Sequence, residues 1–231
     1  MPPLPIADTL QLLVVVAPSW ASTAGLLQRY ERDTRAANWR RLGPGVGVSL
    51  GRAGLAWGRG LHAQQNGLEK REGDGCAPAG VFAITSLFGY APADRAFARA
   101  LKLPYLSTTP DFKAIDDPAS VHYNRIVDQA AVANPDWSSC EDMRRSDERY
   151  AVGAVVAHNA EPPVAGAGSC IFLHVWAAAD VPTAGCTAMA LADMTEIAGW
   201  LDAAAMPLLI QLPLVEHERL FEAWELPPLV A

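Results

Sequence analysis

The first quarter of the chain alternates between short apolar runs and turn-forming residues. The runs are separated by Gly, Pro and Ser, and they read LLVVV (12–16), GLLQRYERD (25–33), GVGVSLG (45–51) and AGLAWGRGL (53–61). Short apolar or alternating runs bounded by turn residues are typical of β-strands. The pattern therefore predicts a series of hairpins, with Leu10 to Ala17 as the first strand.

The rest of the chain adds more strands and two helices. Strands are predicted at residues 81–84, 121–128, 151–157, 169–176 and 207–213, and helices at residues 91–101 and 192–205. Both helices carry apolar residues at helical spacing, and Asp193 with Glu196 resembles a capping box at the start of the second helix. We expect a mainly β fold with a few helices (α+β), built from twisted mixed β-sheets that are mostly antiparallel.

Two polar segments lack a clear period. Residues 102–120 look irregular, and so do residues 133–147. The second segment is either a loop on the substrate side of a site or a surface excursion, and the pattern alone leaves both open.

Composition and charge indicate the number of domains and the kind of partner. The 231 residues are 51% hydrophobic and carry a net charge of −7, and no Pro/Ser-rich linker divides them. We expect a single domain over residues 1–231. No basic stripe with interleaved aromatic residues is present, so we expect no nucleic acid partner.

Membrane and export signals are also missing from the pattern. No apolar run approaches the roughly 20 residues that a membrane-spanning helix needs. The apolar stretch LQLLVVVAP (10–18) is short and follows no Lys or Arg, which favours a strand over a signal peptide.

The segment LHVWAAADVPTAGCTAM (173–189) joins a histidine to a cysteine in a glycine turn. In a strand, side chains alternate between two faces. One face of the predicted strand then carries Cys170, Phe172, His174 and Trp176, and the other carries Ile171, Leu173 and Val175.

Three interpretations of this pair are open from the residues alone. His158, Cys170, His174 and Cys186 are zinc-type ligands, but they lack the short paired spacing of structural zinc sites. His174 and Cys186 could equally be a satisfied core histidine and a small buried residue. In the third interpretation, the glycine turn exposes a Cys186 nucleophile beside free backbone N–H groups, and His174 moves its proton.

A resemblance favours the third interpretation. The stretches HNAEPPVAGAGSCIFLHVW (158–176), PTAGCTAM (182–189) and WLDAAAMPLLIQLP (200–213) together resemble the catalytic region of the YkuD-type L,D-transpeptidases. The likeness extends upstream to GRAGLAWGRGLH (51–62), KREGDGCAPAGVFAITSLFGY (70–90) and DDPASVHYNRIVD (116–128). His174 and the motif of Thr183, Gly185 and Cys186 match the family's histidine and its S/T-x-G-C nucleophile.

The resemblance implies a cysteine acyltransferase that needs no metal and no cofactor. Cys186 is the implied nucleophile and His174 its base, oriented by a backbone carbonyl, while N–H groups around Gly185 hold the oxyanion. It also implies an L,D-transpeptidase-like fold in which the hairpins of residues 1–62 are integrated with a catalytic core of about residues 63–215.

The implied substrates and location follow from the family's chemistry. The substrates are peptidoglycan stem peptides, carbapenem-type β-lactams are acylating inhibitors, and the location is the periplasm or cell envelope. A cysteine peptidase or amidase that hydrolyses stem peptides, and a non-catalytic wall-binding protein of the same fold, are the alternatives.

Two positions depart from the commoner family motif. Ala184 stands where that motif has a histidine, and Ala188 where it has an arginine. The residues usually found there help to orient the acyl donor, so the departures bear on which donor is accepted and on whether water or an amine completes the reaction.

Further residues are candidates for contacts with substrate. They are His158, Asn159, Trp176, Thr183, Thr187, Tyr123 and Asn124. For several of them, capping a strand or packing in the core is the alternative.

The four cysteines also have possible structural roles. Cys76 and Cys140 lie in loops where the resemblance does not predict cysteine, so a bridge between them is an open possibility. A bridge between Cys170 and Cys186 would silence the enzyme.

Overall fold

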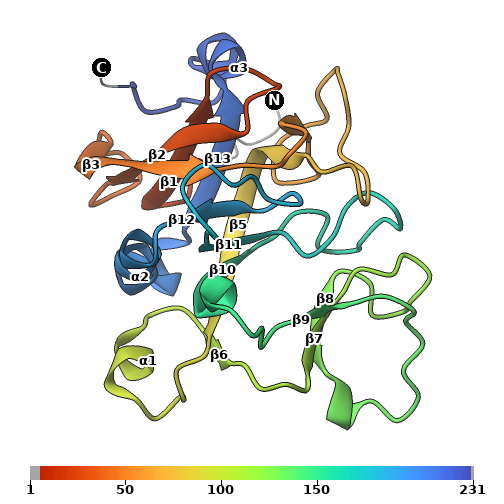
Figure 1. The fold of residues 1–231 in the computed structure, drawn as a ribbon. Coiled ribbons are helices and arrows are strands. Elements are labelled where there is room, and N and C mark those ends of the chain that lie inside the picture. The colour runs from red at the N-terminus through yellow and green to blue at the C-terminus, as the bar shows by residue number, and fades with distance from the viewer. Residues whose placement is uncertain (1–5, 230–231) are drawn as a thin grey trace.

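The structure, a computed structural model, describes residues 6–229 and is built mainly from strands (Figure 1). The strands are β1 (Gln11–Ala17), β2 (Ala24–Glu31), β3 (Arg40–Ser49), β4 (Leu55–Trp57), β5 (Ala77–Gly89), β6 (Tyr105–Ser107), β7 (Phe112–Ile115), β8 (Arg125–Asp128), β9 (Glu141–Asp142), β10 (Val152–Val156), β11 (Phe172–Val175), β12 (Thr187–Met189) and β13 (Leu208–Pro213). The helices are α1 (Ala96–Ala100), α2 (Leu191–Trp200) and α3 (Leu214–Leu220). The predicted mainly β, α+β fold is confirmed.

The larger sheet closes on itself. Its strands follow the order β10-β11-β12-β3-β2-β1-β13-β5-β4, and β10 also pairs with β5. The 13 residues of β5 allow this closure, because one half of the strand pairs with β13 and the other half with β10. Among the described strands, all pairings are antiparallel except β1–β13, β4–β5, β5–β6 and β11–β12, as predicted for a mixed, mostly antiparallel sheet.

The N-terminal strands lie inside this sheet. β1 has the sequence QLLVVVA and is buried along nearly its whole length, between antiparallel β2 and parallel β13. The predicted hairpins are confirmed for β1–β2 and β2–β3. The hairpin predicted for the fourth run (53–61) is wrong, because β4, which lies in this run, pairs in parallel with β5.

A second, smaller sheet was only partly predicted. It has the order β8-β7-β9 and is drawn in green beside the lower end of the main sheet in Figure 1. Residues 102–120, expected to be irregular, contain β6 and β7, which have only three and four residues and so show no clear period. The strand expected at 121–128 begins only at Arg125, because the residues before it form turns.

The helices are shorter than predicted. Residues 91–95 form a turn, so α1 begins at Ala96. α2 begins at Leu191 after an uncapped Ala190, which places Asp193 inside the first turn instead of at the cap. Residues 203–205 form a separate 3₁₀ turn, because the Asp202 carboxylate accepts the backbone N–H of Ala204. No helix within residues 6–229 is both long and apolar enough to cross a membrane.

β11 separates two hydrophobic clusters, as its alternation predicted. Ile171, Leu173 and Val175 belong to the main core. Cys170 and Phe172 point the other way, into a smaller cluster that also contains Phe88, Ala114, Met143, Tyr150 and Cys186. The face that carries His174 therefore borders this smaller cluster.

Aromatic rings hold the smaller cluster together. The ring centroids of Phe88 and Phe172 are 5.1 Å apart, and that of Tyr150 lies 5.4 Å from Phe88 and 5.7 Å from Phe172. All three pairs are edge-to-face, an arrangement in which each pair contributes about 0.5–1.5 kcal/mol beyond its buried area. This cluster places Tyr150 beside the face of β11 that carries His174.

Asn124 joins the small sheet to the segments around β10 and β11. It has a left-handed backbone (φ 63°), and its Nδ2 donates to the carbonyls of His158 (2.9 Å) and Asn159 (2.7 Å). Its Oδ1 accepts the N–H of Cys170 at 2.8 Å. One amide side chain thus satisfies three backbone groups from two segments distant in sequence.

Replacing Asn124 with alanine should lower the free energy of unfolding by about 2–3 kcal/mol. Three backbone groups would lose their partner, and alanine tolerates a left-handed backbone less well than asparagine does. Urea unfolding at pH 7 measures the change, and Asn38→Ala is the control because Asn38 is exposed. Equal effects of the two substitutions would contradict this structural role.

Candidate active site

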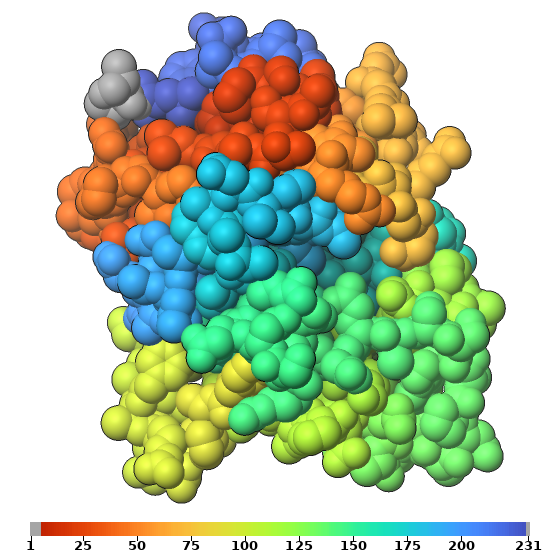
Figure 2. All heavy atoms as spheres, viewed as in Figure 1, coloured from red at the N-terminus to blue at the C-terminus, as the bar shows by residue number. Residues whose placement is uncertain are grey.

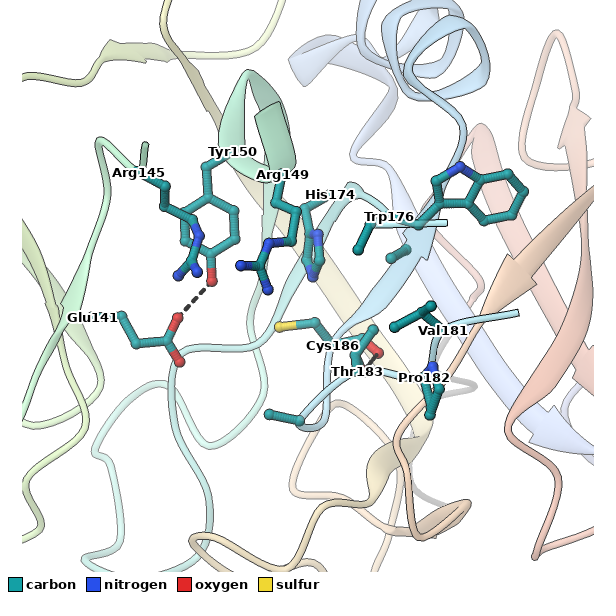
Figure 3. A pocket seen from close by; sticks show the side chains of 13 residues that line it. Glu141, Arg145, Arg149, Tyr150, His174, Trp176, Val181, Pro182, Thr183 and Cys186 are labelled. Carbon is teal, nitrogen blue, oxygen red and sulfur yellow. Dashed lines mark hydrogen bonds between the residues drawn. The ribbon is translucent and has the colours of Figure 1, made fainter. Parts of the chain in front are cut away.

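A pocket of about 200 Å³ lies between the end of β11 and the segment that leads into β10 (Figure 3). Its lining residues are Glu141, Arg145, Arg149, Tyr150, His174, Trp176, Ala177, Val181, Pro182, Thr183, Ala184, Cys186 and Ala188. Figure 2 shows the segment near residue 150 adjoining the segment near residue 175 on one face of the molecule. Four predicted site residues, His174, Trp176, Thr183 and Cys186, meet here.

Thr183 shapes the turn that carries Cys186. Its hydroxyl donates to the carbonyl of Cys186 at 2.6 Å and accepts the N–H of Gly185 at 3.1 Å. A Cβ on Gly185 would lie 3.0 Å from the carbonyl oxygen of Cys76, closer than most side chains tolerate. The turn therefore needs glycine next to the cysteine, and the hydroxyl fixes its shape.

The thiol of Cys186 is buried among backbone groups of β11. The sulfur accepts the N–H of Phe172 at 3.3 Å and lies 3.6 Å from the carbonyl oxygen of Cys170. Within residues 6–229, the N–H of Cys186 itself has no acceptor, whereas that of Gly185 is bonded to Thr183. The Cys186 N–H is thus available to hold an oxyanion.

His174 is oriented by its own strand. Its Nδ1 lies 2.8 Å from the carbonyl oxygen of Val175, so Nδ1 carries the proton and donates it to that carbonyl. Nε2 of the neutral ring is then a free acceptor. Figure 3 shows the ring directed towards the side chain of Cys186. A thiol and a proton acceptor therefore share one side of the pocket.

Burial keeps both groups uncharged. It raises the pKa of the Cys186 thiol to about 12, and the Glu141 carboxylate adds to the increase. Burial also lowers the pKa of His174 to about 4, against the effect of the bond to Val175. At neutral pH the pair consists of a thiol and a neutral imidazole.

Glu141 and Tyr150 form the wall that the thiol faces. The Tyr150 hydroxyl donates to Oε2 of Glu141 at 2.5 Å. The Tyr150 ring lies edge-to-face with the His174 ring, with centroids 5.3 Å apart. Burial raises the pKa of both Glu141 and Tyr150.

Two arginines complete this wall. The Asp147 carboxylate accepts from Nε of Arg149 at 2.8 Å and from Nε of Arg145 at 3.3 Å. The bonds from Arg149 are the largest cause that lowers the pKa of Asp147, to about 2, so this carboxylate is ionised. Asp147 does not line the pocket, whereas both guanidinium groups do.

Residues 133–147 were left open as a substrate-side loop or a surface excursion, and the structure shows that part of this segment lines the pocket. Glu141 and Arg145 come from this segment, and Arg149 and Tyr150 follow it directly. Sequence reasoning did not identify these four residues. The only signal was the density of charge in CEDMRRSDERY (140–150).

The structure does not bring His158 and Asn159 into the pocket. Nδ1 of His158 accepts the N–H of Arg59 at 3.2 Å, and its Nε2 is bonded to the carbonyl of Ala167 at 3.0 Å. Asn159 donates to the carbonyls of Val164 and Gly168, both at 2.9 Å. Both side chains instead organise the loop between β10 and β11.

Three more predicted substrate contacts lie outside the pocket lining. The hydroxyl of Tyr123 donates to Glu72, and that of Thr187 donates to Gln211 at 2.7 Å in the buried interior. Asn124 is used in the bonds to the β10 and β11 segments described above. In each residue a protein partner occupies the polar group that substrate contact would need.

The charged loop before β5 supports the cysteine turn from behind. Lys70 is only 4% exposed in its side chain and pairs with Asp74 at 2.8 Å. Asp74 also accepts the N–H of Cys76 at 2.8 Å. A Cβ on Gly185 would lie 3.5 Å from Nζ of Lys70, so this ion pair packs against the turn.

All four cysteines are free, so the possible bridges are not formed. The thiol of Cys76 donates to the carbonyl of Ala53 at 3.6 Å, and Cys140 lies partly exposed elsewhere. Cys170 directs its sulfur to the carbonyl of Ile115 at 3.4 Å, and not to Cys186. Within residues 6–229, no group of three or more His, Cys, Asp or Glu side chains is arranged to hold a metal ion.

Comparison with known families identifies a matching family. Residues 20–210 match the family described as the L,D-transpeptidase catalytic domain (YkuD). No curated protein and no solved structure matches the chain. The matched span contains every residue that lines the pocket, including His174 and Cys186.

The neutral state of the pair predicts how Cys186 reacts with iodoacetamide. Only the thiolate reacts, and with a pKa of about 12 the thiolate fraction is small at pH 7 and increases about tenfold per pH unit. The alkylation rate should therefore rise from pH 7 to pH 10 without a plateau, as followed by peptide mass mapping. A plateau near pH 7 would show a thiolate–imidazolium pair instead.

Proposed function

The chain belongs to the family of L,D-transpeptidase catalytic domains, and we propose that it is a cysteine L,D-transpeptidase that acts on peptidoglycan stem peptides. One observation carries the proposal: Cys186 and His174 line the same pocket, and His174 presents a free Nε2 on the side of the thiol. A thiol and an imidazole can serve as the nucleophile and the base of acyl transfer.

The first half of the proposed reaction forms a thioester. The sulfur of Cys186 attacks the carbonyl carbon of the scissile amide while its proton passes to Nε2 of His174. The backbone N–H of Cys186 donates to the oxyanion of the tetrahedral intermediate. The C–N bond then breaks, and His174 returns the proton to the leaving amine, which leaves the acyl group on the sulfur.

The second half releases the acyl group. An amine from another stem peptide attacks the thioester carbonyl, His174 takes its proton, and the sulfur departs and recovers a proton from His174. The product is a new amide and the free thiol. If water attacks in place of the amine, the product is a free carboxylate.

The neutral pair influences how the first step proceeds. Because burial raises the pKa of Cys186 and lowers that of His174, moving the proton before attack would create two unfavourable charges. Proton transfer is therefore coupled to bond formation, since the oxyanion donor then stabilises the charge that develops. A buried, unreactive resting thiol is consistent with this coupling.

The proposed place of action is the cell envelope, in the periplasm. Peptidoglycan stem peptides are found there, outside the cytoplasmic membrane. We propose carbapenem-type β-lactams as acylating inhibitors, because their strained carbonyl offers Cys186 the same kind of target.

A carbapenem tests the nucleophile directly. The reduced protein should gain one adduct on Cys186, detected by intact mass and peptide mapping, and Cys186→Ala should gain none. His174→Gln should slow acylation by about 10²–10⁴-fold, the usual contribution of a general base. Cys140→Ala is the control and should acylate normally, because Cys140 does not line the pocket.

Two results would contradict the proposed nucleophile. One is an adduct that persists in Cys186→Ala. The other is the absence of an adduct on the protein without substitutions, although iodoacetamide modifies its Cys186.

A stem peptide with and without an acceptor amine tests transfer itself. The unchanged protein should join donor and acceptor into one product of higher mass, and Cys186→Ala should form none. Hydrolysed donor alone, at every acceptor concentration, would show that water completes the reaction and that the chain is a peptidase.

A further inference from the structure

Two guanidinium groups in the pocket have no role in the proposed thioester chemistry. Arg145 and Arg149 precede β10 and extend into the pocket from the wall formed with Glu141 and Tyr150 (Figure 3). Val181 and Pro182 lie on the other side of the pocket in the same view. The reaction above needs only Cys186, His174 and a backbone donor, so it does not account for these two cations.

Asp147 holds the two arginines from behind. Its Oδ2 accepts from Nε of Arg149 at 2.8 Å and from Nη2 at 2.5 Å, and its Oδ1 accepts from Nε of Arg145 at 3.3 Å. The Arg145 guanidinium also lies over the Tyr150 ring, 5.3 Å from its centroid. Both side chains are therefore oriented before any ligand enters.

Several donor groups remain free in this arrangement. Within residues 6–229, the two terminal nitrogens of Arg145 have no protein acceptor, and neither does Nη1 of Arg149. The side chains are 28% and 42% exposed, so a ligand can reach them. Free, oriented guanidinium nitrogens are the donors that match a carboxylate best.

The charged groups that face the pocket are mainly cationic. Its lining contains two guanidinium groups and one carboxyl group, Glu141, and one oxygen of that carboxyl already accepts from Tyr150. Asp147 stays outside the lining. His174 is neutral at pH 7, because burial lowers its pKa to about 4. Asp147 offsets part of the positive charge from behind, so what the pocket presents to an anion is the free guanidinium nitrogens.

We propose that Arg145 and Arg149 form a carboxylate clamp, which selects acyl donors that carry a free carboxylate close to the scissile amide. The proposal rests on the proposed function, because it takes Cys186 as the point of attack. Both guanidinium groups and the Cys186 thiol line the same pocket, so an anion held by the arginines lies near the carbonyl that Cys186 attacks. The carboxylate belongs either to the leaving residue or to the side chain of the acyl-donor residue.

A purely structural role is the competing explanation for these arginines. Asp147 begins the 3₁₀ turn Glu148–Tyr150 and accepts the N–H of Arg149 at 3.0 Å, so its ion pairs could simply stabilise that turn. Such a role would affect all ligands equally. A clamp would affect only ligands that carry the carboxylate.

The test measures binding to Cys186→Ala, which cannot form the thioester. The probes are a synthetic stem tetrapeptide with free carboxylates and two versions in which either the leaving-residue or the side-chain carboxylate is a primary amide. Calorimetry should show about tenfold weaker binding for one of the two amides, since a charge-assisted pair is lost. The amide that binds weakly identifies which carboxylate is held.

The arginine variants then show whether Arg145 and Arg149 cause the preference for the free carboxylate. In Cys186→Ala/Arg145→Gln and Cys186→Ala/Arg149→Gln, the free peptide should bind about tenfold more weakly, and amidation should change its Kd less than twofold. Cys186→Ala/Arg144→Gln is the matched control and should keep the full preference. Arg144 stacks on Tyr90 at 4.5 Å and does not line the pocket.

The clamp is overturned if neither amide binds more weakly than the free peptide in Cys186→Ala, a comparison that needs no arginine variant to fold. It is also overturned if the preference persists in both arginine variants. Thioester formation is tested separately, on the protein without substitutions. Acylation without a carboxylate preference removes only the clamp, and a preference without acylation removes only the proposed reaction.

Discussion

The parallel pairing of β11 with β12 is the constraint on which the site depends. Its register sets His174 opposite Ala188, and Cys186 lies two residues before Ala188 on the same face. The backbone N–H of Phe172 accordingly meets the Cys186 sulfur. A slip of one residue would turn the thiol into the main core, because neighbouring residues of a strand face opposite sides. The two strands of a parallel pair must be joined by a connection outside the sheet. Residues 176–186 form this connection, which contains Thr183 and the glycine turn.

The second requirement is a wall opposite this pair. It comes from β9 of the small sheet, which contributes Glu141, and from the segment between β9 and β10, which contributes Arg145 and Tyr150. Edge-to-face contacts hold Tyr150 against Phe88 and Phe172, while Asn124 joins the small sheet to the backbone beside β11. The same burial that packs this wall removes water from the thiol and the imidazole, which explains why both are neutral. Packing and reactivity are thus two consequences of one arrangement.

The two alanines of the motif affect the chemistry of the pocket. Ala184 and Ala188 both line it, so the two positions contribute neither charge nor hydrogen bonds through their side chains. The only lining residues that carry a positive charge at neutral pH are Arg145 and Arg149, from a separate part of the chain. In the proposed reaction the roles are therefore divided: the glycine turn supplies attack and oxyanion binding, and the opposite wall supplies the charged side chains.

The sequence by itself determined the mainly β fold class, the first strand and the alternation of β11, because each depends on the local spacing of apolar residues. The residues alone left the roles of His174 and Cys186 open, and the family resemblance singled them out. Only the tertiary structure decided that β10 and β5 close the sheet, that Lys70 lies buried behind Gly185, and that His158, Asn159 and Asn124 bond to backbone groups. It also brought Glu141, Arg145 and Arg149 to the thiol. Contacts between residues far apart in the chain leave no local period, so a pattern of neighbours cannot encode them.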